Sequence, residues 1–271
     1  MAAPVLVTDS SSYLPAGLAE ALGVRVVPLH VTLGDWSFDE GAVPPAAFYA
    51  RLRASGDVPT TSQPAPGEFL EVFTAAASAG ADRVLCVTCT ASMSGTHRAA
   101  VLAAGMAPVA VDVVDSGTIS GGLTLVVGRL ARELASGTAY DQVLALARSM
   151  AGRVRSTWCS DTNALLAAGG RLPDQVPDGV PVLALDGAVR VLGAARSTDE
   201  ALALQASVVR EAARRTPTWV TVGHGDVPLL ADQLAGLLDG APGVLGIDRY
   251  VVGPAVGAHA GAGNVGASYL V

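Results

Sequence analysis

The chain has 271 residues, of which 51% are apolar and 15% charged, so it can bury a substantial core in one or two domains. All 17 basic residues are arginines against 24 acidic residues, which leaves a net charge of −7 and no lysine. Without lysine, a pyridoxal Schiff base, a lysine-dependent aldolase and a Walker-type phosphate loop are excluded. The acidic balance also argues against nucleic acid as a partner.

The first half of the chain alternates short apolar runs with amphipathic helical segments, which is typical of an α/β domain with a parallel sheet. The predicted strands cover residues 5–7, 24–31, 84–88 and 109–114. Predicted helices cover residues 15–22, the segments around Phe48 and Phe69, and three segments that begin near Thr96, Leu123 and Tyr140. Asp9 and the serines after it are expected to cap the helix at 15–22, and a proline-rich loop is expected at 58–66.

The pattern changes after residue 153. Two apolar runs, 181–185 and 189–192, flank Asp186-Gly187, a strong hairpin signal. Helices are predicted at 198–214 and 228–238, and strands at 219–222, 246–252 and 267–271. We therefore expect a parallel-sheet α/β domain at 1–152 and a smaller mixed α+β domain at 153–271, with a ligand between them.

Three cysteines in a chain of this length favour a reducing compartment over a disulfide framework. The first residues show no basic region followed by an apolar stretch, and no apolar run reaches the ~18 residues of a membrane span. We expect a cytoplasmic protein. Cys86 and Cys89 imitate a metal or redox pair, but they fall on a predicted strand, where residues three apart point to opposite faces, so no metal site is expected.

Hydroxyl side chains gather where several predicted strands end. In parallel sheets, ligands bind beyond the carboxyl ends of the strands, where helix N-termini also point. The hydroxyl-rich segments are 8–12, 60–63, 88–96 and 115–120. Together they predict a cradle for an oxygen-rich, anionic headgroup, although helix capping alone accounts for any one of them.

A glycine-rich run covers residues 253–263 and contains His259. Its last part matches the dinucleotide pattern G-x-G-x-x-G at 261–266, but that pattern requires a following helix and only five residues remain. We expect instead a tightly turning backbone that presents His259, with a purely structural histidine as the alternative.

Serine hydrolases of the α/β type carry a G-x-S-x-G turn, which this chain lacks. Ser94, His97 and Asp115 are separated in sequence but can still meet in space. Hydrolase chemistry therefore stays open as an alternative.

A series of short motifs runs along nearly the whole chain. The motifs are Thr8-Asp9-Ser10-Ser11, Thr61-Ser62-Gln63-Pro64, Ser94-Gly95-Thr96, Asp115-Ser116, Gly169-Gly170-Arg171, Asp186-Gly187, Arg196-Ser197, and Gly253-Pro254 through His259 to Gly263. Each motif is weak alone, but in order and spacing the series resembles the DegV family, the fatty-acid-binding proteins that carry the acyl chain in bacterial fatty acid kinase.

This resemblance implies two α/β domains and one long-chain fatty acid in an internal tunnel, with its carboxylate held by hydroxyls near the interdomain cleft. It also implies a separate kinase subunit that binds ATP, so the chain itself is expected to be no enzyme and to need no cofactor or metal. The implied ligand-binding residues are Thr61, Ser62, Thr90, Ser92, Ser94, Gly95 and His259. Arg196 is the implied docking residue for the kinase.

The chain departs from the family pattern at three places. The serine pair usual before S-G-T is replaced by Thr90-Ala91, so that Thr90 or Ser92 has to supply the second hydroxyl. The H-x-G-P-G motif reads H-A-G-A-G from His259 onward. The basic cluster usual near Arg196 is reduced to that one arginine, which leaves the use of a kinase partner open.

Two hypotheses of different classes follow. The preferred one is a non-enzymatic carrier that binds a long-chain fatty acid and presents its carboxylate for acyl-phosphate formation. The alternative is a hydrolase or transferase that acts on a small acyl or phosphorylated substrate, with His259 as base or nucleophile.

Overall fold

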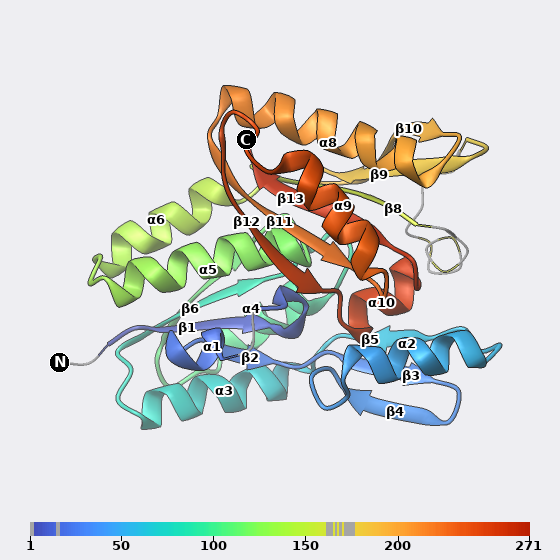
Figure 1. Ribbon diagram of the computed structural model, residues 1–271. Helices are drawn as coiled ribbons and strands as arrows, with labels where there is room; N and C mark the ends of the chain where they lie inside the picture. The colour runs from blue at the N-terminus through green and yellow to red at the C-terminus, as the bar shows by residue number, and fades with distance from the viewer. Residues whose placement is uncertain (1–2, 15–16, 161–164, 166, 168–169, 171–176) are drawn as a thin grey trace.

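Two large β-sheets, each covered by helices, and one small sheet make up the described part of the protein (Figure 1). The computed structural model describes residues 3–14, 17–160, 165, 167, 170 and 177–271. The predicted α/β class is confirmed: one large sheet is parallel and the other is mixed.

Sheet A is the predicted parallel sheet of the first half. Its strands, in spatial order, are β2 (Arg25–Val27), β1 (Val5–Asp9), β6 (Arg83–Thr88) and β7 (Ala110–Asp115). Because side chains alternate along a strand, Cys86 and Leu85 of β6 enter separate apolar clusters on opposite faces. The cluster on one face includes α3 (Pro66–Ser78) and α4 (Thr96–Ala104), and that on the other includes α5 (Gly121–Ala135) and α6 (Tyr140–Met150).

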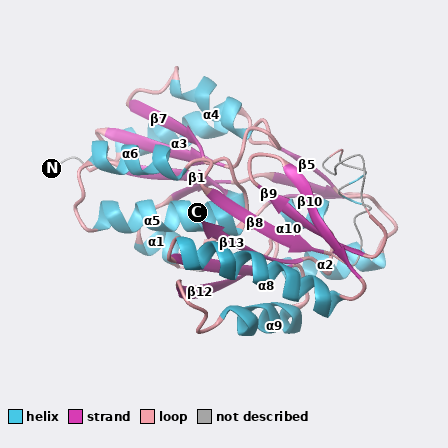
Figure 2. Ribbon diagram, turned by 90° about the horizontal axis from the view of Figure 1, so that it is seen from above, coloured by secondary structure: helices cyan, strands magenta, loops and turns pink. Residues whose placement is uncertain are grey.

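Sheet C is mixed and belongs to the second half of the chain. Its strands, in spatial order, are β10 (Val189–Ala195), β9 (Val180–Leu185), β8 (Val154–Cys159), β13 (Val265–Leu270), β11 (Thr218–His224) and β12 (Val244–Val251). Only β11 and β12 run parallel among these neighbours. The predicted hairpin is confirmed, since Asp186-Gly187 joins β9 to β10 with Gly187 at φ +98°. One face is covered by α8 (Thr198–Arg215) and α9 (Pro228–Leu238), as Figure 2 shows.

A small antiparallel sheet B differs from the sequence prediction. Its strands, in spatial order, are β4 (Trp36–Asp39), β3 (His30–Leu33) and β5 (Thr60–Ser62). The single strand predicted at 24–31 is wrong: proline cannot donate a ladder hydrogen bond, and at Pro28 the chain leaves sheet A and re-forms as β3. The loop predicted at 58–66 is also wrong in part, because β5 pairs with β3.

Two helices pack on sheet B. They are α2 (Pro45–Ala54) and α10 (Pro254–Ala260), whose buried residues share one apolar cluster with Val31 and Leu33. The end of the chain is thereby brought against residues 29–62, far away in sequence. The predicted tight turn at 253–263 is therefore wrong in part, since most of that run forms α10.

The start of the chain differs in a smaller way. The helix predicted at 15–22 is shorter, because α1 covers Leu18–Ala21, and residues 15 and 16 lie outside the described part. Asp9 caps the short 3-10 helix η1 (Ser10–Ser12) instead, accepting the N–H of Ser11 at 3.1 Å.

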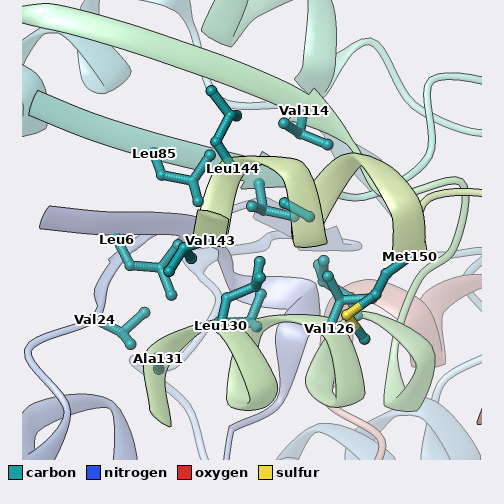
Figure 3. Packing of buried hydrophobic residues seen from close by; sticks show 14 of the residues in the cluster. Leu6, Val24, Leu85, Val114, Val126, Leu130, Ala131, Val143, Leu144 and Met150 are labelled. Carbon is teal, nitrogen blue, oxygen red and sulfur yellow. The ribbon is translucent and has the colours of Figure 1, made fainter. Parts of the chain in front are cut away.

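Helix α5 belongs to a core that reaches both large sheets. Figure 3 shows its Val126 and Leu130 packed below α6, with Leu6 and Leu85 of sheet A alongside. The same cluster includes Val154 of sheet C. Whether residues 1–152 and 153–271 fold as separate domains stays a prediction. Of the helices described, none is long and apolar enough to cross a membrane.

Candidate ligand-binding cavity

A cavity lies between the loops at the carboxyl ends of sheet A and the face of sheet C that α8 and α9 leave open. It holds about 960 Å³ of space, part of it open to solvent. Its apolar lining consists of Leu29, Cys89, Met93, Ile119, Trp158, Leu185, Val252, Ala255, Val256, Ala260 and Ala267. Its polar lining consists of Ser11, Thr61, Ser94, Ser120, Ser156, Thr157, Tyr250, His259, Asn264 and Ser268.

The described lining contains no Asp, Glu, Lys or Arg. A full charge can therefore come only from His259, when its ring is protonated. Most of the surface inside the cavity is apolar, although polar side chains are spread among the lining residues. Such a cavity suits a ligand that is mostly hydrocarbon and carries a small polar head.

Thr61 and His259 meet at the cavity wall. The Thr61 Oγ1 and His259 Nε2 atoms lie 2.7 Å apart and share a hydrogen bond whose direction depends on the protonation of the ring. Thr61 comes from β5 and His259 from the last turn of α10. The structure thus brings together two of the residues that the family resemblance implies.

Helix α10 is held in place by a buried acid. Glu40 accepts the N–H of Ala255 in the first turn at 2.7 Å, the Tyr13 hydroxyl at 2.9 Å and the Ser10 hydroxyl at 2.8 Å. Burial raises the pKa of Glu40 to about 7, although these three donors favour the charged form. Tyr13 in turn accepts the N–H of Val256 at 3.0 Å, so the position of α10 is set by residues near the start of the chain.

Glycine in the run 253–263 is required by close packing. A Cβ at Gly257 would stand 2.5 Å from the Tyr49 hydroxyl, which donates to the Val252 carbonyl at 2.9 Å. Gly261 ends the helix at φ +78°, a conformation that favours glycine. The run therefore lets α10 lie directly against α2, with His259 in its last turn.

A second buried acid shapes the opposite wall. The Asp9 carboxylate accepts the Ser11 hydroxyl at 2.5 Å and the N–H of Cys89 at 2.6 Å, and burial raises its pKa. Ser11 and Cys89 both line the cavity. Asp9 therefore positions these two groups without itself being part of the lining.

Of the other predicted ligand residues, Ser94 lines the cavity, whereas Ser62, Thr90, Ser92 and Gly95 do not. Ser62 follows Thr61 in β5, where neighbouring side chains point to opposite faces. Thr90 is buried and shares a hydrogen bond of 3.0 Å with the exposed Ser92. Ser94 does line the cavity and shares a hydrogen bond with Thr96, while Gly95 lies under the side chain of Gln63. A Cβ at Gly95 would overlap that carboxamide.

Arg196 is exposed between β10 and α8. Its N–H donates to Glu200 at 2.9 Å, and Ser197 caps α8 by accepting the N–H of Glu200 at 3.2 Å. The motif Gly169-Gly170-Arg171 lies outside the described residues except for Gly170.

Several lining residues come from sheet C and were not singled out by the sequence. Along β13, the residues Gly266, Ala267 and Ser268 all line the cavity, and Ala267 also belongs, with Tyr269, to the apolar cluster under α8 and α9. Ser268 shares a hydrogen bond of 2.8 Å with Ser156 of β8. The signal available for such residues is the alternation of small or polar with apolar residues along a strand.

Neither the hydrolase triad nor the cysteine pair is assembled. Ser94 shares a hydrogen bond with Thr96, and His97 shares one of 3.2 Å with Thr88. Asp115 instead accepts the backbone N–H groups of Ala91 and Gly117. The thiols of Cys86 and Cys89 are free and buried in different apolar clusters. The prediction that both lie on one strand is wrong in part, because β6 ends at Thr88, one residue before Cys89. Across the described ranges, no group of three or more His, Cys, Asp or Glu is placed to hold a metal.

A parallel and a mixed sheet that together enclose a mostly apolar cavity define an α/β protein built around a ligand-sized space. The chain belongs to the DegV family, whose sequence profile matches residues 5–271. It is 34% identical over 269 residues to a DegV domain-containing protein of Streptomyces coelicolor, covering 96% of each chain.

Two solved structures share the whole fold. One is the structure of a DegV family protein from Thermus thermophilus, described for its fatty acid binding. It is 30% identical to this chain, with a TM-score of 0.90, and the match covers 99% of each chain. The other is a Thermotoga maritima protein whose structure reveals a fatty acid binding function, 25% identical with a TM-score of 0.90 and 100% of each chain covered. The fold predicted from the family resemblance is confirmed.

Proposed function

We propose that the protein binds a long-chain fatty acid in this cavity. The observation that carries the proposal is the Thr61–His259 pair, 2.7 Å apart, at the wall of an otherwise mostly apolar cavity. A free fatty acid matches both parts, since its carboxylate accepts hydrogen bonds and its chain needs apolar walls. Fatty acid binding by relatives of the same fold supports this reading.

Thr61 and His259 would hold the carboxylate, with Ser94 as a further donor near them. A protonated His259 donates its Nε2–H to the Thr61 oxygen, so the Thr61 hydroxyl can donate to the carboxylate while the charged ring lies beside the head. A carboxylate beside the ring favours the protonated form of His259. Binding is therefore expected to weaken at high pH, where the ring is neutral.

The second part of the proposal is that a separate kinase subunit phosphorylates the bound acid. A carboxylate oxygen would attack the terminal phosphorus of ATP, the bond to the ADP oxygen would break, and an acyl phosphate would form. The lack of lysine, and hence of a Walker-type loop, supports an ATP site on another chain. Arg196, exposed at the start of α8, is the docking residue that the resemblance implies.

Native mass spectrometry of the protein purified from bacteria tests the first part. We expect a retained mass equal to a C16–C18 acid, which is released under denaturing conditions. If the purified protein carries no lipid, binds none of the added acids and hydrolyses a model ester, the enzyme hypothesis replaces the carrier. Adding ATP to the loaded chain alone is expected to yield no acyl phosphate, while a fatty acid kinase ATP-binding subunit restores it.

A further inference from the structure

A second cavity lies behind the first, on the far side of the first turns of α5. It holds about 1570 Å³ of space, part of it open to solvent. Leu125 and Met150 contribute apolar wall, and Thr124 and Thr221 contribute hydroxyls. The rest of the lining is mixed, with further apolar residues and the charged residues Arg129, Arg132, Glu133 and Asp248. Nothing in the proposed binding of the carboxylate makes use of this space.

The wall between the two cavities is thin. In the antiparallel pair of β11 and β13, Thr221 lies opposite Ser268, yet Thr221 lines the second cavity and Ser268 the first. Gly121 of α5 lies above them: a Cβ there would stand 2.7 Å from the Tyr250 hydroxyl and would overlap the Thr221 hydroxyl. One glycine backbone and one phenol group thus separate a residue of the first cavity from a residue of the second.

Tyr250 is held in this wall from several sides. Its hydroxyl shares a hydrogen bond of 2.9 Å with Ser120 and accepts the N–H of Gly121 at 2.9 Å. Its ring stacks on Tyr13 with the centroids 6.0 Å apart. Burial raises the pKa of Tyr250, so the phenol keeps its proton and its capacity to donate.

Two glycines make room for this ring. A Cβ at Gly223, the partner of Tyr250 across β11 and β12, would overlap the ring, and a Cβ at Gly121 would crowd its hydroxyl. Neither glycine has a positive φ, so the backbone conformation does not require glycine at either position. The need for glycine at both positions comes from the side chains packed against them, the Tyr250 ring among them.

The far side of the wall carries an unsatisfied group. The Thr221 hydroxyl is buried, with 1% of the residue exposed, and has no hydrogen-bond partner among the described residues. A buried hydroxyl without a partner costs free energy. The Thr221 hydroxyl therefore adds nothing to the hydrogen bonds that hold Tyr250 in the wall.

Tyr250 lies at the end of α10 away from the carboxylate site. Tyr13, on which it stacks, accepts the N–H of Val256 in the first turn of α10, whereas His259 is in the last turn. An acyl chain that begins at His259 and runs along α10 would therefore meet Tyr250 with its later carbons.

We propose that Tyr250 sets the upper limit of acyl-chain length by closing the first cavity against the second. The inference rests on the proposed binding of a fatty acid. Each methylene that leaves water strengthens binding by about fourfold. In the natural protein this gain stops at the length where the chain meets the Tyr250 ring, and without the ring it continues into the second cavity.

The test is the affinity for saturated acids of 14 to 22 carbons, measured on delipidated protein by native mass spectrometry in competition with the 16-carbon acid. Tyr250→Ala is expected to move the optimum upward by two or more carbons, which is at least a tenfold gain in the ratio of the 20-carbon to the 16-carbon affinity. The ester-to-acid preference set by the headgroup site should stay unchanged.

Thr221→Leu fills the second cavity from behind and serves as the matched control. Alone it should leave the length profile unchanged, and combined with Tyr250→Ala it should cancel the extension. An unchanged profile in Tyr250→Ala, or an extension that survives Thr221→Leu, overturns the role of Tyr250. If Tyr250→Ala does not fold, Tyr250→Leu decides in its place. Failure of the natural protein to bind any of these acids would instead refute the proposed function.

Discussion

Thr61 and Ser62 are neighbours in β5, yet only Thr61 faces the cavity. Thr61→Ala is expected to weaken binding of a free fatty acid by about 1.5–3 kcal/mol, the net contribution of a hydrogen bond to a charged group. The methyl ester of the same acid carries no full charge and should lose much less. Calorimetric titration of both ligands into delipidated protein measures the difference.

Ser62→Ala is the matched control, since it removes a hydroxyl one position away on the exposed side of the strand. It should leave the affinity for acid and ester unchanged. Equal losses for acid and ester in Thr61→Ala would mean that Thr61 shapes the cavity without holding the carboxylate.

Glu40 makes stability depend on pH in a direction unusual for a carboxyl group. Its pKa is about 7 in the folded protein and near 4.5 when exposed, because burial disfavours the charge. Between these values the folded state binds more protons than the unfolded state, so the free energy of unfolding falls as pH rises. The loss from this group is on the order of 3 kcal/mol across the window from pH 4.5 to 7.

Glu40→Gln keeps an oxygen that can accept the N–H of Ala255 but cannot ionise. Its free energy of unfolding is expected to vary less between pH 5 and 8 than that of the natural protein. Urea unfolding at several pH values compares the two. Parallel pH profiles for both proteins would show that Glu40 is not the group responsible.

At the scale of elements, α10 depends on how closely it approaches α2. Gly257→Ala would place a methyl group 2.5 Å from the Tyr49 hydroxyl, so a shift of the helix is expected to cost about 1–3 kcal/mol of stability. Because His259 lies on the same helix, fatty acid affinity should fall as well. Thermal melting and calorimetric titration measure the two effects.

Gly236→Ala is the control for helix propensity. Gly236 lies in α9 with open space where a Cβ would stand, so alanine there is expected to stabilise by about 0.5–1 kcal/mol without changing affinity. If Gly257→Ala is equally harmless, the close packing of α10 on α2 is not what positions His259.

The sequence predicts best those helices and strands whose pattern of apolar residues lies within the element itself. The strands at β6 and β7 and the helices α8 and α9 show strong periodicity, and they were found nearly at their observed bounds. Strand β5 was missed because its three residues, Thr60, Thr61 and Ser62, are polar and gain their strand conformation only by pairing with β3. The glycine run predicts a turn, since glycine disfavours helices, but Glu40 accepts the N–H of Ala255 and so holds the first turn of α10.

The same distinction applies to the cavity. Thr61, Ser94 and His259 belong to short motifs and could be predicted from the family resemblance. Tyr250 and Ser268 could not, because their role arises from the face of sheet C on which they fall, and Glu40 acts on a helix 215 positions later in the chain. Contacts of that separation leave no local pattern in the sequence.

For the whole molecule, a bound fatty acid should act as part of the core. Binding only to the folded state stabilises by about 2.7 kcal/mol when the free ligand is at 100 times its Kd. Delipidated protein is therefore expected to melt at a lower temperature, and added C16 or C18 acid should raise the melting temperature. No shift with any acid of 12 to 20 carbons would contradict the carrier proposal.

The apolar cluster that buries one face of α5 joins the two halves of the chain, since it includes residues of sheet A and Val154 of sheet C. A chain cut at residue 152 would leave that cluster open to water, so the first half is expected to be unstable by itself, and the intact protein should unfold in one calorimetric transition. Hydrogen exchange offers a direct view: filling the cavity, which lies at one edge of sheet A, should slow amide exchange throughout that sheet, including the strand ends far from the cavity. The predicted boundary between the two halves would then divide the sequence without dividing the cooperative unit.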